Sequence, residues 1–259
     1  MEPSPSVQVA LLRLNILGLP IDAGSRKEAV DAVFGALSGG DRMAIVTINA
    51  EMAMAARLDP KLAAIIRGAG LVLPDGSGVV WAARRRGVRV KKIAGVDFIH
   101  EIAEQCVEAG RGMFLLGAGP GVADEAGRFL TARHPGLAIV GMADGYFSPE
   151  AEPELCARIR EARPGALLVA LGVPRQEYWI ADHQQELDVP VCMGIGGSLD
   201  VLSGRVRRAP AWMVAAHLEW LFRLIKEPWR WRRMATALPA FVVAALAAER
   251  QERYTEPGR

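Results

Sequence analysis

The sequence predicts an α/β protein: a mostly parallel sheet with Rossmann-like crossover helices, followed by a basic helical appendage at the C-terminus. Three observations support this fold class. Short apolar runs alternate with segments of helical periodicity, which is typical of sheets built from strand–helix–strand units. The runs are apolar throughout, as parallel strands covered on both faces require. Near residue 204 the composition changes, so we expect an α/β core over 1–204 and an appendage over 205–259.

The elements of the core follow from these two patterns. Apolar runs of strand length predict strands at 43–48, 70–73, 112–116, 137–141, 166–171 and 191–195. Apolar residues at helical spacing predict helices at 25–38, 51–68, 78–86, 95–109, 122–133, 150–162 and 176–187. Because a helix follows each strand, neighbouring strands are expected to run parallel.

The appendage is defined by its charge and its aromatic residues. The stretch 205–233 contains eight Lys or Arg against two acids, and it holds four of the six tryptophans. Aromatic and leucine residues at helical spacing are also typical of an ordinary core. The excess of positive charge favours contact with an anionic membrane surface instead. Pro228 is expected to break the helix, so Arg223 need not share a face with Arg230 and Arg233.

The bulk composition is that of a globular protein in a reducing compartment. The 259 residues are 51% hydrophobic and 23% charged, with a net charge of +2, which excludes a largely disordered chain. Cys106, Cys156 and Cys192 lie far apart in apolar surroundings, without a CxxC pair. We therefore expect three buried free thiols rather than disulfides or metal ligands.

Neither end of the chain is predicted to span a membrane. The N-terminus has no basic region before its short apolar stretch, and Arg13 interrupts that stretch, so no secretory signal is expected. The uncharged run 234–248 contains Pro239 and is shorter than the roughly 20 residues that a spanning helix needs. The expected location is cytoplasmic, peripheral on the inner face of the cell membrane.

The glycine loop at 117–121 is a partial match to a dinucleotide-binding motif. The loop follows a predicted strand and opens a helix, as the dinucleotide fingerprint GxGxxG does. However, Val122 stands where the third glycine belongs, and Asp144 lies further along than the usual ribose-binding acid. An NAD(P)-binding oxidoreductase therefore stays open as an alternative to a tight turn that faces an anion.

Polar residues follow the carboxyl ends of several predicted strands. Thr47 and Asn49 end the first strand, Asp75 follows the second, and Gln176 and Asp200 follow the last two. In an open α/β sheet, ligands bind outside the carboxyl ends of the strands. We therefore expect these five side chains to converge.

Each of these residues also has a purely structural interpretation. Asp75 lies between a proline and a glycine, where aspartate is a common turn residue. Asn49 could cap the following helix, Gln176 and Glu177 could open theirs, and Asp200 could cap a short turn. Their joint occurrence on one edge of the sheet favours a site.

The residues suit acid–base chemistry better than metal or nucleophilic chemistry. The four histidines lack HxxxH or HxH spacing, no aspartate has another two residues on, and no GxSxG elbow occurs. What remains is a single carboxylate with polar neighbours, which is suited to deprotonating a hydroxyl group. No metal is expected.

Several motifs in one order resemble a known family. They are TINAEM, LPDGSGVVWAAR, IAGVDF, FLLGAGPGVADEA, HPGLAIVGMADGYF, ALGVPRQEYWI, GIGGSLDVLSGRVRRAP and HLEWLFRLIKEPWRWRRM. Together they resemble the WecG/TagA/CpsF family of bacterial glycosyltransferases over about residues 14–235. The combination of PDGxG, GxPxQE and the RAPxW…LEWL pattern is far more specific than a glycine loop.

The resemblance implies a hexosyltransferase that needs neither a metal nor a cofactor and inverts the anomeric centre. The donor would be a UDP-sugar carrying an N-acetylmannosamine-type sugar, its uronate or a hexose. The acceptor would be a sugar linked to polyprenyl (undecaprenyl) diphosphate at the membrane, in the biosynthesis of teichoic acid, exopolysaccharide or a related polymer. No nucleic-acid partner is implied, and self-association into a homo-oligomer stays open, as does a non-catalytic assembly factor of a polysaccharide pathway.

The resemblance also assigns roles to residues. Asp75 would be the general base for the acceptor hydroxyl. The substrate-binding residues would be Thr47 and Asn49 in the sugar pocket, Gln176 at donor or acceptor, Gly145, Tyr146 and Asp200 at UDP, and Arg223, Arg230 and Arg233 over the diphosphate. Lys92 departs from the family pattern, which often has Arg in RIxG, so it keeps the charge without a bidentate grip.

Overall fold

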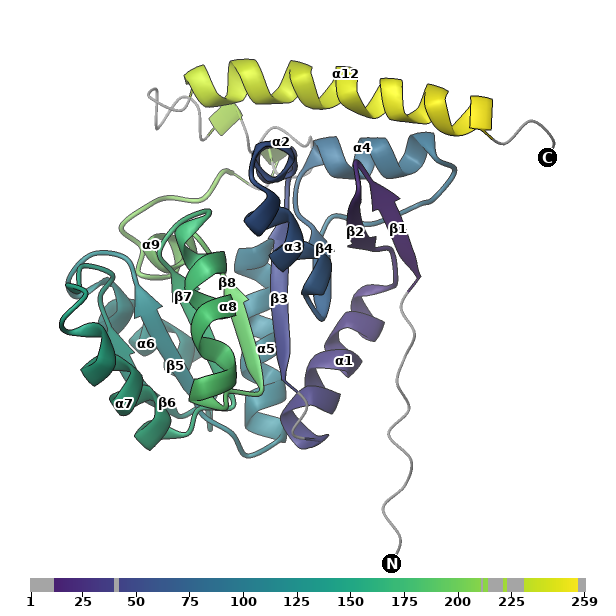
Figure 1. The fold of residues 1–259 in the computed structure, drawn as a ribbon. Helices are drawn as coiled ribbons and strands as arrows, with labels where there is room; N and C mark the ends of the chain where they lie inside the picture. Colours follow the sequence, from purple (N-terminus) through teal and green to yellow (C-terminus); the bar gives the residue numbers. More distant parts are fainter. Residues whose placement is uncertain (1–11, 40–41, 211, 214–220, 223–230, 256–259) are drawn as a thin grey trace, which may run out of the picture.

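The predicted fold class is confirmed: a six-stranded parallel sheet lies between layers of helices (Figure 1). This computed structural model describes residues 12–39, 42–210, 212–213, 221–222 and 231–255. The strand order is β4-β3-β8-β7-β5-β6. The strands are β3 (Met43–Ile48), β4 (Leu71–Pro74), β5 (Met113–Gly117), β6 (Ile139–Ala143), β7 (Ala166–Ala170) and β8 (Val191–Gly194).

Helices cover both faces of the sheet, which is why the strands are apolar throughout. One face packs against α1 (Arg26–Gly39), α5 (Gly95–Glu108), α6 (Val122–Arg133) and α9 (Ser198–Leu202) in a single apolar cluster. The other face packs against α2 (Ala50–Leu58), α3 (Pro60–Gly68), α7 (Glu152–Ala162) and α8 (Arg175–Leu187). Neighbouring residues of a strand belong to opposite faces: Ile45 contributes to the first cluster and Val46 to the second.

The chain leaves neighbouring strands toward opposite faces, and this opens a crevice at their carboxyl ends. The chain passes from β3 into α2 on one face, whereas the loop after β8 leads to α9 on the other. From β4 the chain passes through α4 (Ser77–Arg85) to α5. Such a reversal is where open α/β sheets bind ligands.

The predicted helix at 51–68 is wrong as a single element. It is two helices, α2 and α3, separated by Asp59 in an extended conformation with φ −128° and ψ 94°. The residue before a proline disfavours helical geometry, and Pro60 is the next residue. Asp59 then caps α3, because its Oδ1 accepts a hydrogen bond of 3.1 Å from Leu62 N.

An N-terminal hairpin was not predicted. It consists of β1 (Arg13–Ile16) and β2 (Leu19–Asp22), which pair antiparallel around Leu17 and Gly18, both at positive φ. The hairpin is tied to the edge of the sheet by Asp22, whose carboxylate accepts 2.6 Å from Val72 N and 2.8 Å from Arg13 Nε. Its strands are short, and a Leu–Gly turn lacks the usual Asn–Gly signal.

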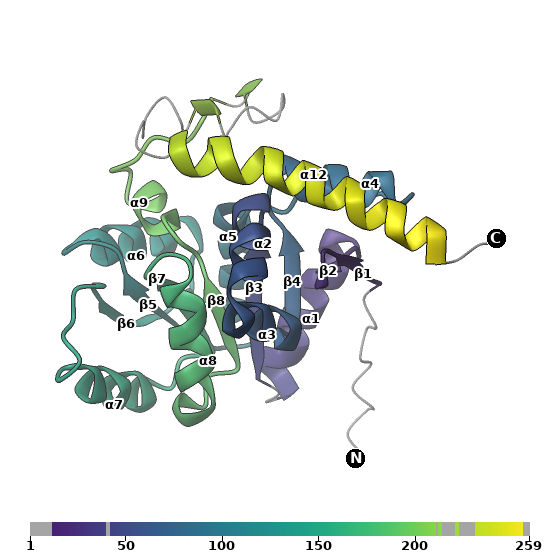
Figure 2. The same ribbon diagram turned by 45° about the horizontal axis from the view of Figure 1, so that its top comes forward.

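The described part of the appendage contains a long helix, α12 (Trp231–Thr255), which crosses over α2 and α4 (Figures 1 and 2). Phe241 is fully buried in the apolar cluster of α2 and α4, and Glu249 forms an ion pair of 2.9 Å with Arg85. None of the helices in the described ranges is both long enough and apolar enough for a membrane crossing. Pro228 lies outside the described residues.

The cysteine prediction is confirmed. Cys106, Cys156 and Cys192 are free and buried. Burial raises the pKa of all three thiols, that of Cys106 to about 12, so they are neutral and behave as small apolar side chains.

Candidate active site

A large cavity lies above the carboxyl ends of β3, β4, β7 and β8. Its volume is about 1790 Å³, and α12 forms the opposite wall. Five of the side chains predicted from the sequence line it: Thr47, Asn49, Asp75, Lys92 and Gln176. The convergence expected from the strand ends is therefore found for Thr47, Asn49, Asp75 and Gln176, whereas Asp200 does not line this cavity.

The end of β3 supplies Thr47 and Asn49. A Cβ on Gly95 would lie 3.3 Å from Cγ2 and 3.5 Å from Oγ1 of Thr47, so Thr47 lies against the first residue of α5. Asn49 is extended and caps α2, because its Oδ1 accepts 2.9 Å from Met52 N. The capping and the site interpretations of Asn49 are thus compatible: it caps a helix whose first turn borders the cavity.

Asp75 is held at the N-terminus of α5. Its backbone N–H donates to Ile48 O at 2.8 Å, and its Oδ2 accepts from Gly95 N at 3.2 Å. Ile93 N donates 2.9 Å to Pro74 O, which joins the loop before α5 to the end of β4. The partial positive charge of a helix N-terminus favours the ionised carboxylate.

Gly76 allows this loop to turn next to β3. Its φ is +132°, a backbone conformation that residues with a side chain rarely adopt, and a Cβ there would lie 3.3 Å from Asn49 Cβ. The turn role of the Pro74–Gly76 sequence is therefore compatible with a site role of Asp75, because the turn brings Gly76, the next residue, beside Asn49.

Gln176 and Glu177 form a buried pair at the start of α8. Gln176 is 2% exposed and Glu177 is 3% exposed. Gln176 Nε2 donates 2.7 Å to Glu177 Oε1, and Gln176 Oε1 accepts 2.9 Å from Gly196 N. Burial raises the pKa of Glu177 to about 7. Neither residue caps α8 through its side chain.

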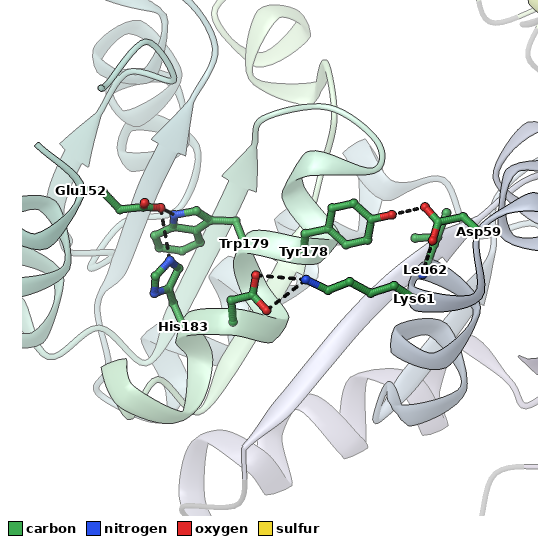
Figure 3. A network of polar contacts seen from close by, with 8 residues as sticks. Asp59, Lys61, Leu62, Glu152, Tyr178, Trp179 and His183 are labelled. Carbon is green, nitrogen blue, oxygen red and sulfur yellow. Dashed lines mark hydrogen bonds and ion pairs between the residues drawn. The ribbon is translucent and has the colours of Figure 1, made fainter. Parts of the chain in front are cut away.

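The part of α8 that follows Glu177 is held by polar contacts to α3 on one side and to α7 on the other (Figure 3). Toward α3, the Tyr178 hydroxyl donates to Asp59 Oδ2, and the Asp59 carboxylate raises the pKa of Tyr178 to about 12. Toward α7, Glu152 Oε1 accepts 2.7 Å from Trp179 Nε1 and lies 3.2 Å from His183 Nε2. These contacts fix the helix that carries Gln176 into the cavity.

Gly145, Tyr146 and Asp200 do not line this cavity. Gly145 N donates 2.9 Å to Ala118 O in the glycine loop. Tyr146 is 80% exposed and borders a second, smaller cavity of about 420 Å³ at the ends of β5 and β6. Asp200 lies in the first turn of α9, and its backbone carbonyl accepts 2.9 Å from Val206 N. Their assignment to the UDP site stays a prediction.

The glycine loop is occupied by protein contacts. Ala118 N donates 3.0 Å to Ala170 O of the neighbouring strand. Arg205 covers the loop: it donates 3.3 Å to Pro120 O and pairs with Glu125 at 2.7 Å. The first turn of α6 carries the acids Asp124 and Glu125, which disfavour a pyrophosphate at that helix end.

The side chains of the three appendage arginines lie outside the described part of the structure. Arg223 and Arg230 lie outside the described residues. Arg233 belongs to α12, and its side chain is likewise outside the described part. The wall that α12 contributes was missed by sequence reasoning. Apart from Thr236, the residues that α12 contributes to it are apolar: Ala237, Leu238, Pro239, Ala240, Val243, Ala244, Ala247 and Ala248.

The family model of the glycosyl transferase WecG/TagA/CpsF family matches residues 14–255. The chain belongs to this family. It is 36% identical over 207 residues to the N-acetylglucosaminyldiphosphoundecaprenol N-acetyl-beta-D-mannosaminyltransferase of Bacillus spizizenii, covering 80% of this chain and 79% of that protein. It is 34% identical over 232 residues to the protein of the same name from Bacillus subtilis strain 168, covering 89% and 87%.

As a member of the WecG/TagA/CpsF family, the protein is a glycosyltransferase. The oxidoreductase alternative is therefore wrong, and so is the alternative of a non-catalytic assembly factor. Val122 was the informative departure from the dinucleotide fingerprint: it is buried in the core rather than open to a ligand.

Proposed function

We propose that this glycosyltransferase moves an N-acetylmannosaminyl group from UDP to N-acetylglucosaminyl-diphospho-undecaprenol, with inversion and without a metal. The relatives from the two Bacillus strains carry this acceptor and this sugar in their names. The observation that carries the proposal is the convergence of Asp75, Thr47, Asn49, Lys92 and Gln176 on one cavity.

In the proposed reaction, Asp75 takes the proton of the acceptor hydroxyl. The acceptor oxygen forms a bond to the anomeric carbon as the bond from that carbon to the UDP oxygen breaks on the opposite face. One carboxylate is enough for such a displacement, because no covalent sugar–enzyme intermediate forms. The hydrogen bond from Gly95 N orients the Asp75 carboxylate before the transfer.

The departing diphosphate gathers negative charge, which cations must balance. Lys92 and Arg57 line the cavity, and the appendage arginines are proposed to add to them. Lys92 provides a compact charge with three donors rather than the planar fork of an arginine.

The apolar wall suits the lipid part of the acceptor. Along α12 the cavity is bordered by alanines and by Leu238 and Val243, and Met54 and Leu58 of α2 line it as well. Leu58 is 88% exposed and Val243 is 67% exposed. We propose that the isoprenoid units next to the diphosphate lie along this wall while the sugar reaches the polar end.

A panel of donors tests the proposal. The full chain is mixed with a short polyprenyl-diphosphate N-acetylglucosamine acceptor and UDP-N-acetylmannosamine, its uronate, UDP-N-acetylglucosamine or UDP-glucose. We expect UDP-N-acetylmannosamine to give the highest kcat/KM, and we expect the rate to persist in excess EDTA. A lack of transfer from every donor contradicts the proposal, and loss of the rate in EDTA contradicts its metal-independent form.

The appendage is proposed to hold the enzyme on an anionic membrane surface. Its basic stretch provides roughly 1 kcal/mol of attraction for each Lys or Arg near such a surface. We expect the full chain to float with vesicles containing phosphatidylglycerol and to stay behind with phosphatidylcholine alone. Arg230→Glu with Arg233→Glu should reduce flotation. Equal binding of wild type and variant to both vesicle types contradicts the proposal.

A further inference from the structure

We propose that Glu177 is a positioning residue, which fixes the amide of Gln176 and, through it, the Gly196 loop at the cavity wall. The inference rests on the proposed function for the identity of the ligand, but its geometry stands on described contacts. Glu177 is not among the residues that line the cavity, whereas Gln176 and Gly196 are. Glu177 therefore acts through Gln176 rather than on the substrate.

The three residues form one hydrogen-bonded chain. Gly196 N donates 2.9 Å to Gln176 Oε1, and Gln176 Nε2 donates 2.7 Å to Glu177 Oε1. An ionised carboxylate only accepts hydrogen bonds, and a backbone N–H only donates. The amide of Gln176 can therefore satisfy both neighbours in one orientation alone.

This orientation decides what Gln176 offers to a ligand. A primary amide has two N–H groups and two lone pairs. One of each is used by Glu177 and Gly196, so one N–H and one lone pair remain for the cavity. A sugar hydroxyl both donates and accepts, which matches the remaining pair. A flipped amide would turn its N–H groups toward Gly196 N and break the chain.

The end of β8 leaves space for the side chains of Gln176 and Glu177. A Cβ on Gly194, at the end of β8, would lie 2.6 Å from Gln176 Nε2 and 2.9 Å from Glu177 Oε1, closer than carbon atoms approach such groups. Glycine at position 194 therefore makes room for the pair. Glu177 Oε2 is buried and has no hydrogen-bond partner among the described residues. Burying a carboxylate oxygen without a hydrogen bond costs free energy. A glutamate with only a structural role could avoid this cost at the surface.

The charge of Glu177 depends on pH in the neutral range, because its burial raises its pKa to about 7. The titratable group on which the charge of Glu177 acts is the Tyr178 hydroxyl, which donates to Asp59. Strands β3 and β7 contribute no titratable side chain, and the buried Cys192 thiol of β8 stays neutral. The carboxylate therefore accepts most strongly above pH 7, and its hold on Gln176 weakens as the pH falls through about 7.

Four variants test the role: Gln176→Ala, Glu177→Ala, the double variant and Glu177→Gln. We measure kcat and KM for UDP-N-acetylmannosamine from pH 6 to 8. A UDP-sugar is the right ligand, because its diphosphate diester does not titrate in this window. Each alanine variant should lose roughly tenfold to a hundredfold in kcat/KM, the effect of losing a buried hydrogen bond. Because Glu177 acts through Gln176, the double variant should lose no more than Gln176→Ala alone.

Glu177→Gln separates positioning from a merely structural role. It keeps the shape and removes the titrating group, so its kcat/KM should be flat with pH where the wild type declines below pH 7. Glu186→Gln, which removes an exposed carboxylate on the same helix, is the matched control and should keep the wild-type profile. Multiplicative losses in the double variant overturn the inference, and so does an unchanged pH profile in Glu177→Gln.

A readout independent of transfer completes the test. Hydrogen exchange of the Gly196 backbone N–H, followed by NMR, should speed up in both alanine variants. If Asp75→Asn keeps its turnover while Gly196 responds as expected, the proposed function fails and the positioning role stands. If Gly196 exchange is unchanged in Glu177→Ala, the positioning role fails by itself.

Discussion

Asp75→Asn lowers the turnover of the enzyme by about 10² to 10⁴, the usual contribution of a positioned general base. Asparagine fits the same loop and its side-chain oxygen can still accept from Gly95 N, so the fold should be retained. What it cannot do is take a proton from the acceptor hydroxyl. The loss should therefore appear in kcat, with KM for the donor nearly unchanged. Turnover is measured with the lipid-linked acceptor, and folding by the thermal midpoint.

The control for this prediction is Asp188→Asn. Asp188 follows α8 at the surface, with its side chain 77% exposed. The same chemical change there should leave kcat at the wild-type value. If Asp75→Asn turns over as fast as Asp188→Asn, Asp75 is a turn residue and not the base.

Phe241→Ala has the second largest expected effect, because it releases α12 from the core. Phe241 is fully buried, and a Cβ on Gly78 would lie 3.6 Å from its ring. Replacing a buried phenylalanine by alanine destabilises a packed site by about 3 to 5 kcal/mol. The wall of the cavity that α12 forms should then be lost, and transfer to the lipid-linked acceptor should fall with it.

Hydrogen exchange along α12 measures the release directly. In Phe241→Ala the amides of α12 should exchange faster, while those of β5 and β7 in the sheet stay protected. Val242→Ala, one residue on and 37% exposed, is the control and should leave the exchange of α12 unchanged. Equal protection of α12 in both variants contradicts the account of its docking.

The sheet was predictable because its strands are apolar on both faces. Each of the six strands was expected within two residues of its observed bounds, and only the short elements were missed. The hairpin depends on Asp22 reaching Val72 across fifty residues of sequence, a contact that no local pattern reveals. The division of α2 from α3 had a signal in Pro60, which a reading of helical periodicity alone overlooked.

The site residues that follow directly after a strand were predictable from the sequence. Thr47, Asn49, Asp75 and Gln176 were found because the carboxyl ends of parallel strands share an edge. The helix beginning at Gly95 was predicted, but its contact with Asp75 was not foreseen, since Gly95 is twenty residues further along the chain. Glu177 was placed at this edge, but its burial behind Gln176 was not foreseen, and the wall formed by α12 was missed. Both depend on packing between elements distant in sequence.

The anomeric configuration of the product tests the central claim most directly. The wild-type enzyme is given UDP-N-acetylmannosamine and the lipid-linked acceptor, and the one-bond carbon–proton coupling of the new anomeric centre is measured by NMR. With Asp75 as a base in a single displacement, the product must have the configuration opposite to that of the donor. Retention of the donor configuration would contradict the account, because one carboxylate acting only as a base cannot produce it.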